Sequence, residues 1–194
     1  MKHEEKQGKV ALNQQLKLEA ILSAAYDLFI TKGIEDTTIN EITEQAGIGK
    51  GTLYIYFDNK YEIAREIVNR QIRQFLSEFF SQINRSLSTE FKKALQHLSD
   101  YLVDYIADDP MKRKFIMNYI GHQFARPEII IPEQVQELLN ISSAYDSQTA
   151  NNMLEAVLSS TCFFACTLLD RGLDTGAIKQ RIRRISAALI EEFE

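Results

Sequence analysis

The chain has 194 residues, of which 45% are hydrophobic and 25% are charged, with eight glycines and three prolines. This composition is typical of a soluble globular protein and excludes disordered, collagen-like and low-complexity chains. The formal net charge of −5 gives no overall sign of nucleic-acid binding. Two cysteines are too few for a disulfide scaffold, and residues 1–10 contain no apolar run, so we expect no signal peptide and a cytoplasmic location.

Helical periodicity begins near Leu16. Apolar residues recur four positions apart from Leu16 to Phe29 and make one wide apolar face, which predicts a helix that ends at Gly33. Thr38 and Glu41 have the spacing of a capping box, in which each side chain bonds the backbone N–H of the other residue. This pair predicts the start of a second, short helix.

A tight turn and a third helix follow. Gly47 ends the short helix and allows the left-handed backbone conformation that such a turn needs. A further short helix is expected from Lys50 to Phe57, and a long amphipathic helix begins at Lys60 and continues to about Ile83. Two short helices joined by a turn that contains glycine form a helix-turn-helix unit.

The rest of the chain also has helical periodicity. Five further helical segments are expected, at about residues 88–108, 111–124, 135–145, 148–171 and 175–192. Residues 153–169 are apolar around most of the helix but are shorter than a typical membrane span, so we expect them in a core or between subunits. Because no alternating strand pattern of five or more residues is evident, the sequence predicts an all-α fold of about nine helices.

The helix expected at Lys50–Phe57 has an exposed face suited to the DNA major groove. Its members combine a cation, a residue without a side chain, hydroxyl groups and apolar surface: Lys50, Gly51, Thr52, Tyr54, Ile55 and Tyr56. Residues 1–60 contain seven lysines and nine acids, but the stretch from Ile48 to Phe57 has one lysine and no acid. Since phosphate binding depends on the local face, we expect salt-sensitive DNA binding here.

Residues 16–62 resemble the DNA-binding domain of the tetracycline-repressor (TetR) family of bacterial transcription regulators. The resemblance rests on the order AGI, then GKGTLYIYF, then a polar residue, then NK. It implies an all-helical homodimer with an N-terminal three-helix helix-turn-helix domain, residues 1–60. It also implies a larger C-terminal domain, residues 61–194, that binds a small effector and dimerises through its last two helices.

The resemblance also implies a set of DNA contacts. Hydroxyl and ammonium groups would bind phosphates, while short side chains early in the recognition helix would reach base edges. The implied DNA-binding residues are Thr38, Gly49, Lys50, Gly51, Thr52, Tyr54, Tyr56 and Lys60. Gly49 departs from the family pattern, which often has Ser or Thr there, so one hydroxyl contact is missing. Tyr56 stands where His is common and keeps a hydrogen-bond donor.

The C-terminal domain offers a candidate ligand pocket and a candidate dimer interface. Aromatic and methionine side chains with a few polar groups are typical of small-molecule sites, although each of them also suits a helical core. The candidate pocket residues are Tyr101, Tyr105, Met117, Tyr119, His122 and Phe124, which favour a hydrophobic or amphipathic effector. The candidate interface residues are Phe164, Leu168, Ile182, Ile185 and Leu189, in a four-helix bundle made by two subunits.

We find no pattern for catalysis. No Ser-His-Asp or Cys-His arrangement is evident, the two cysteines lack metal-ligand spacing, and Gly51 follows Lys50 where a phosphate-binding loop needs Ser or Thr. We therefore expect that the protein is not an enzyme and that it holds no metal and no cofactor. The sequence predicts a sequence-specific transcriptional regulator, a repressor released from a palindromic operator by a small effector. The alternatives are a helical enzyme with an incidental helix-turn-helix and a constitutive DNA-binding dimer without an effector.

Overall fold

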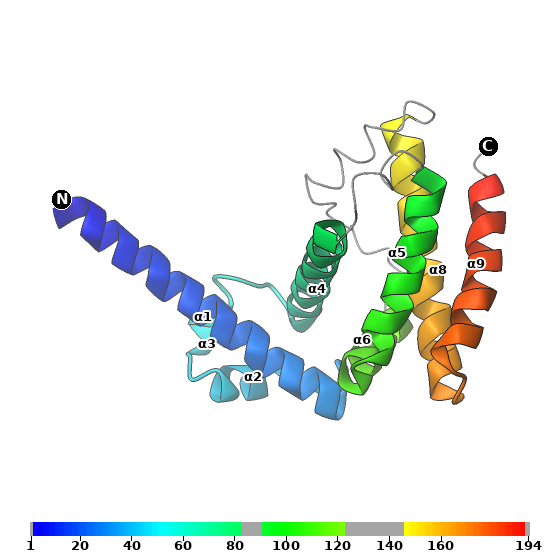
Figure 1. The fold of residues 1–194 in the computed structure, drawn as a ribbon. Coiled ribbons are helices and arrows are strands. Elements are labelled where there is room, and N and C mark those ends of the chain that lie inside the picture. Colours follow the sequence, from blue (N-terminus) through cyan, green and yellow to red (C-terminus); the bar gives the residue numbers. More distant parts are fainter. Residues whose placement is uncertain (1, 83–90, 123–145, 193–194) are drawn as a thin grey trace. The chain divides into compact units, whose positions relative to one another are not determined.

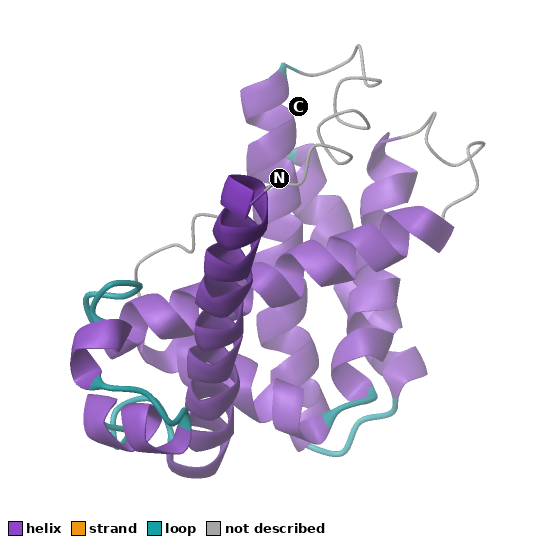
Figure 2. Cartoon of the chain, turned by 90° about the vertical axis from the view of Figure 1, so that its left-hand side faces the viewer, coloured by secondary structure: helices purple, strands orange, loops and turns teal. Residues whose placement is uncertain are grey.

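The computed structural model describes residues 2–82, 91–122 and 146–192, and within these ranges the chain forms eight α-helices and no strands (Figures 1 and 2). The helices are α1 (Lys2–Lys32), α2 (Ile39–Gln45), α3 (Lys50–Leu53), α4 (Lys60–Gln82), α5 (Phe91–Ala107), α6 (Pro110–His122), α8 (Ser147–Asp170) and α9 (Thr175–Glu191). The predicted all-α fold class is confirmed. The helix expected at 135–145 lies outside the described residues.

The chain divides into two compact units, Met1–Val68 and Asn69–Glu194. The division falls inside α4, whereas the sequence placed the domain boundary at the start of that helix. The physical reason is that the first turns of α4 bury Ile63 and Ile67, while its later turns contribute Phe75 and Leu76 to the core of the second unit. One continuous helix therefore belongs to both units.

The first unit consists of α1, α2, α3 and the start of α4. Its buried apolar side chains include Ile21, Ala25, Phe29, Ile34, Ile42, Leu53, Phe57 and Ile63. α1 is longer than the sequence predicted, because it begins at Lys2 and its N-terminal half extends past α2 and α3 (Figure 1). The prediction that Leu16 belongs to the buried face is wrong: its side chain is 58% exposed, since it lies beyond the small core.

The second unit is built around α5, which packs against both α8 and α9, while α8 and α9 also pack against each other. α6 packs against α5 and α8. Three buried hydroxyls meet where α5, α8 and α9 converge. The Thr161 hydroxyl donates to Ser99 Oγ at 3.3 Å, and Ser99 Oγ lies 3.4 Å from Ser186 Oγ. These small polar groups satisfy one another, which offsets the cost of burying them.

Two ion pairs attach α9 to α5 at the surface of this unit. Lys179 Nζ lies 2.6 Å from a carboxylate oxygen of Asp104, and Arg183 Nη2 lies 2.5 Å from Asp100 Oδ2. The Asp100 carboxylate also holds the pKa of Arg183 above its ordinary value. Because one partner of each pair, Asp104 or Arg183, is largely exposed, each pair contributes little stability, but together they fix which side of α9 faces α5.

α8 has a strongly apolar composition. The helix segment Gln148–Asp170 is long and apolar enough to cross a membrane by length and composition alone, although the run 153–169 was expected to be too short. A core helix of a soluble protein passes the same test, and α8 packs against α5, α6 and α9. Packing within its own unit therefore accounts for the apolar residues on the inner side of α8, while Phe163 on its outer side is 46% exposed.

The two cysteines lie one turn apart on α8 and are free thiols, with Cys166 buried and Cys162 partly buried. Desolvation raises the pKa of each thiol to about 12. Since the thiolate is the reactive form, we expect the folded protein at pH 8 to react very slowly with Ellman's reagent. Both thiols should react rapidly in guanidinium chloride. A fast reaction of either thiol in the folded protein would contradict this account of α8.

Candidate nucleic-acid interface

The N-terminus of α2 is held by the capping box that the sequence predicted. The Thr38 backbone N–H and hydroxyl both donate to Glu41 Oε2 at 2.9 Å, and the Glu41 N–H donates to Thr38 Oγ1 at 3.3 Å. Lys32, in the last turn of α1, forms an ion pair with the same carboxylate. The Lys32 ammonium and the donors of Thr38 lower the pKa of Glu41 to about 2.

This lowered pKa predicts a pH dependence of stability. A carboxyl whose folded pKa is below its unfolded value of 4.5 stabilises the fold above pH 4.5 and loses that effect as the pH falls through about 2. We therefore expect Glu41→Gln to lower the melting temperature at pH 7. The difference from the parent should shrink between pH 4.5 and 2, as followed by circular dichroism. A difference that is constant over this range would contradict the capping assignment.

The turn between α2 and α3 has the geometry expected of a helix-turn-helix. Gly47 has φ of +67°, a left-handed conformation that costs a residue without a side chain little. The Ile48 N–H donates to the Thr43 carbonyl at 3.0 Å, which closes the turn. α3 ends at Leu53, shorter than predicted, but hydrogen-bonded turns continue to Phe57. Leu53 and Phe57 are buried and anchor this segment to the core of the unit.

The outer surface of α3 and the following turn presents most of the predicted DNA-binding side chains. Lys50 and Gly51 are exposed, Thr52 is partly buried, and Tyr54 is 52% exposed. Gly49 caps α3 with its backbone alone and makes no side-chain hydrogen bond. None of the ion pairs formed by the described residues involves Lys50. The fold therefore brings Lys50, Thr52 and Tyr54 together on one small, solvent-accessible element.

Tyr56 is also placed on this element, but its hydroxyl has a partner within the unit. It donates to the backbone carbonyl oxygen of Gln14, on α1, at 3.2 Å. A phosphate can only accept hydrogen bonds, so the one proton of this hydroxyl cannot serve Gln14 and a phosphate together. In this conformation the hydrogen bond of Tyr56 attaches the end of the recognition segment, residues 50–57, to the N-terminal half of α1.

Lys60 is likewise engaged inside the first unit. Its ammonium donates to the carbonyl oxygens of Glu35 and Thr37 at 2.5 and 3.1 Å, and so attaches the start of α4 to the loop before α2. The hydroxyl of Thr38 donates to Glu41, as described above. The partner of Thr38 was predicted as a capping box, whereas the partners of Tyr56 and Lys60 lie 42 and 25 positions away and leave no local signal in the sequence. Their internal bonds show that each of them also supports the fold.

Four of the predicted pocket residues lie in the second unit around α5 and α6. Tyr101 and Tyr105 pack against the ring of Phe75 on α4, with centroid distances of 5.4 and 5.1 Å. Lys112 Nζ lies 3.5 Å from the ring centroid of Tyr105. Met117 is partly buried and Tyr119 is 4% exposed. The side chain of His122 and the whole of Phe124 lie outside the described residues. Phe75 and Lys112, which contact Tyr101 or Tyr105, were not among the predicted pocket residues.

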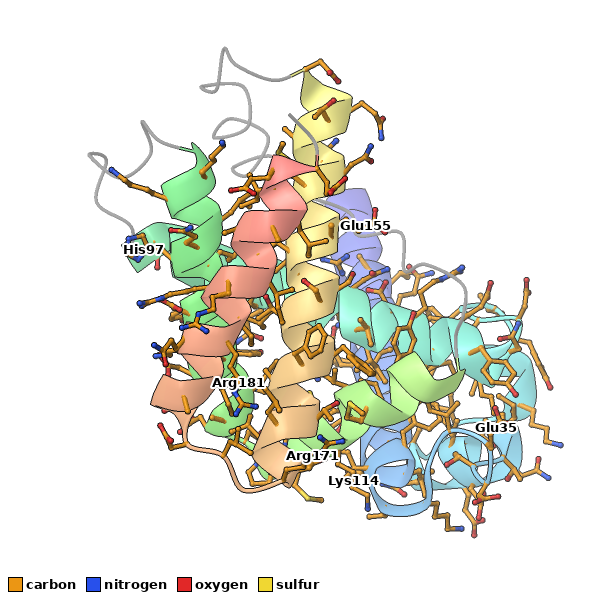
Figure 3. All side chains as sticks on the ribbon, turned by 90° about the vertical axis from the view of Figure 1, so that its right-hand side faces the viewer. Glu35, His97, Lys114, Glu155, Arg171 and Arg181 are labelled. Atoms are coloured by element: carbon orange, nitrogen blue, oxygen red, sulfur yellow. The ribbon has the colours of Figure 1, made fainter. Side chains whose placement is uncertain are left out.

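The predicted interface residues differ in what they offer to a partner. Ile182 is 1% exposed within the single chain, so it belongs to the core of its own unit and its assignment to a free surface is wrong. Phe164 and Leu168 also pack partly against this core, whereas their neighbour Phe163 is 46% exposed. Ile185 and Leu189 are half-buried. Figure 3 shows α8 and α9 side by side, with Glu155 on α8 and Arg181 on α9.

The segment that contains the exposed surface of α3 is similar to a known family of regulators. Residues 21–67 match the model of the family described as bacterial regulatory proteins, tetR family. The match covers residues 21–67 of 194, so this segment is similar to that family. Within the described residues, the chain contains no group of three or more His, Cys, Asp or Glu residues that could hold a metal ion.

Two curated regulators of transcription are similar to this chain. The chain is 30% identical over 101 residues to an HTH-type transcriptional regulator of Staphylococcus aureus (strain bovine RF122 / ET3-1), which is 52% of each protein. It is 30% identical over 91 residues to a regulator of the same description from strain USA300, which is 47% of this chain and 48% of that protein. The chain thus spans about half the length of the curated relatives it matches.

Two solved structures share the fold over most of the chain. The fatty acid degradation regulator FadR from Bacillus halodurans has a TM-score of 0.58 at 18% identity, covering 88% of this chain and 94% of FadR. RolR in complex with resorcinol has a TM-score of 0.60 at 18% identity, covering 95% of this chain and 96% of RolR. At such low identity these likenesses show the all-helical architecture alone.

Proposed function

We propose that this protein belongs to the tetR family and is a sequence-specific, DNA-binding regulator of transcription in the cytoplasm, and not an enzyme. The observation that carries the proposal is the exposed surface of α3. It presents Lys50, Thr52 and Tyr54 to solvent while Leu53 and Phe57 anchor the segment from below. A short, rigidly anchored element with one cation and hydroxyl groups suits phosphates and base edges of the major groove.

We propose further that the regulator acts as a homodimer. The outward face of α8 supports this proposal, because Phe163 is 46% exposed in the single chain and its neighbour Phe164 contacts it ring to edge at 5.6 Å. Two subunits related by a two-fold axis would carry two copies of α3 and would match a palindromic operator. A partner would bury Phe163 of α8 together with Ile185 and Leu189 of α9.

The third part of the proposal is a small effector that releases the DNA. It is supported by the aromatic cluster of Phe75, Tyr101 and Tyr105 in the second unit, and by RolR, a fold neighbour that binds resorcinol. Such a cluster desolvates an apolar ligand at little cost and a strongly charged ligand at high cost. A hydrophobic or amphipathic compound is therefore proposed, acting through its different affinity for the DNA-bound and released states.

Selection from a pool of random DNA duplexes tests the first two parts together. The full chain is incubated with the pool, bound duplexes are amplified over several rounds, and the enriched sequences are read. We expect an inverted repeat whose half-sites lie on one face of the duplex. Enrichment of a single half-site would contradict the dimer, and no enrichment over a control with denatured protein would contradict DNA recognition.

Thermal shift measurements test the effector. Apolar and amphipathic aromatic compounds should raise the melting temperature, since a ligand that binds only the folded state stabilises it by RT ln(1 + [L]/Kd). The same compounds should release the selected duplex in a fluorescence anisotropy titration. If the only stabilising compounds are sugars, nucleotides or other strongly polar molecules, the aromatic cluster is not the binding site. If none of the stabilising compounds releases DNA, the protein binds DNA constitutively.

A further inference from the structure

Ile55 is an apolar side chain that the folding of the first unit leaves in water. At 79% exposure it is the most exposed of the large hydrophobic residues in the described part of the chain. It directly follows Tyr54 in the turn that continues α3. Since Ile55 buries almost nothing within its own chain, its packing does not explain why an apolar residue stands at this position.

Ile55 lies on the outermost, solvent-facing side of the recognition segment, residues 50–57. With about 100° of rotation per residue, Ile55 lies on the side opposite Leu53 and Phe57, which are buried. Gly51, one turn earlier, lies on the same side and has open space around the position of a Cβ atom. The flank of the Ile55 side chain is therefore uncovered, and a ligand can approach it closely over Gly51.

The surroundings of Ile55 favour DNA as the group that covers it. The stretch from Ile48 to Phe57 contains Lys50 and no acid, so the surface attracts a polyanion. When such a segment enters the major groove, its two lateral sides face the phosphates and its outermost side faces the base edges. Among the base edges of that groove, the C5 methyl group of thymine is the apolar feature with which an aliphatic side chain makes a favourable contact.

We propose that Ile55 is a specificity-determining residue that contacts the C5 methyl group of a thymine in each half-site. This inference rests on the proposed function and deepens it, because it names the base and the atom that Ile55 recognises. The contact buries one methyl group against the isoleucine side chain. Its loss should weaken binding by about 3- to 5-fold per half-site, and by about 10- to 20-fold when both half-sites are changed.

Replacement of thymine by deoxyuridine isolates this methyl group, because uracil pairs as thymine does and lacks only the C5 methyl. Each thymine of the selected duplex is replaced in turn, symmetrically in both half-sites, and the Kd is measured by fluorescence anisotropy. We expect one position at which deoxyuridine raises the Kd of the parent protein by about 10- to 20-fold. Ile55→Ala should bind the unmodified duplex with a similar loss and be insensitive to deoxyuridine at that position.

The control variant is Met111→Ala, which truncates another exposed apolar side chain, 48% exposed on α6. It should keep the full deoxyuridine effect. Ile55→Ala should keep the parent's melting temperature, since the side chain is exposed, and its sedimentation coefficient without DNA.

Four outcomes overturn the inference, and they are distinguishable. If no duplex is enriched, the proposed function fails and the inference with it. If a duplex is enriched but no thymine position responds, or if Ile55→Ala remains as sensitive as the parent, the inference alone fails. A changed sedimentation coefficient of Ile55→Ala would instead assign Ile55 to contact between copies of the chain.

Discussion

Replacing Lys50 by glutamate is expected to abolish operator binding, with a loss on the order of 100-fold or more in Kd at moderate salt. Lys50 is exposed at the start of α3, and it is the one cation between Ile48 and Phe57. Reversing its charge in both subunits removes two phosphate contacts and adds repulsion at the same points. The Kd of the selected duplex, measured by anisotropy at several salt concentrations, is the readout.

A neutral variant separates the loss of the contact from the added repulsion. Lys50→Gln should bind more weakly than the parent but more tightly than Lys50→Glu. Its slope of log K against log salt should be smaller in magnitude by about 2 for a dimer, or about 1 per subunit. Both variants should keep the parent's melting temperature, because Lys50 lies outside the core. An unchanged Kd for Lys50→Glu would mean that α3 is not part of the DNA interface.

Phe163→Asp is expected to convert the dimer to monomers. Phe163 is 46% exposed in the single chain, so a partner that covers it would bury two unpaired carboxylates, one from each subunit. A penalty of several kcal/mol at each site should raise the dimer dissociation constant by about three orders of magnitude or more. Sedimentation velocity at micromolar concentration measures the change, and operator affinity should fall in parallel.

The neighbouring position supplies the matched control. Phe164 packs partly against the core of its own unit, so Phe164→Asp should lower the melting temperature, whereas Phe163→Asp should leave the monomer's secondary structure intact. Arg181→Ala, on the exposed face of α9, tests whether truncating a charged side chain on α9 also converts the dimer to monomers. An unchanged dimer for Phe163→Asp would mean that the outward face of α8 is not the interface.

The parts of the fold that the sequence predicted correctly depend on local signals. The capping box of Thr38 and Glu41 needs only four consecutive residues. Gly47 marks its turn because a left-handed backbone favours glycine. These signals act within one turn of helix, so they can be recognised without knowing the rest of the structure.

The features that the sequence did not predict depend on distant contacts. Leu16 continues the apolar spacing of α1 but lies beyond the three-helix core, so periodicity alone could not tell that it is exposed. Ile182 has the spacing of a helix seam, but periodicity does not say whether a seam faces its own chain or a partner. The bond from Tyr56 to Gln14 joins residues 42 positions apart, and nothing in either local sequence indicates it.

Two copies of α3 are proposed to read successive major grooves of one operator. Phosphate ethylation interference on the selected duplex tests this proposal most directly, because it reports which phosphates the bound protein needs. The account predicts two symmetric clusters of interfering phosphates on one face, about one helical turn or a multiple of it apart. Lys50→Gln should lose interference at the same phosphate in both clusters. A single cluster, or a pattern that Lys50→Gln leaves unchanged, would contradict the account.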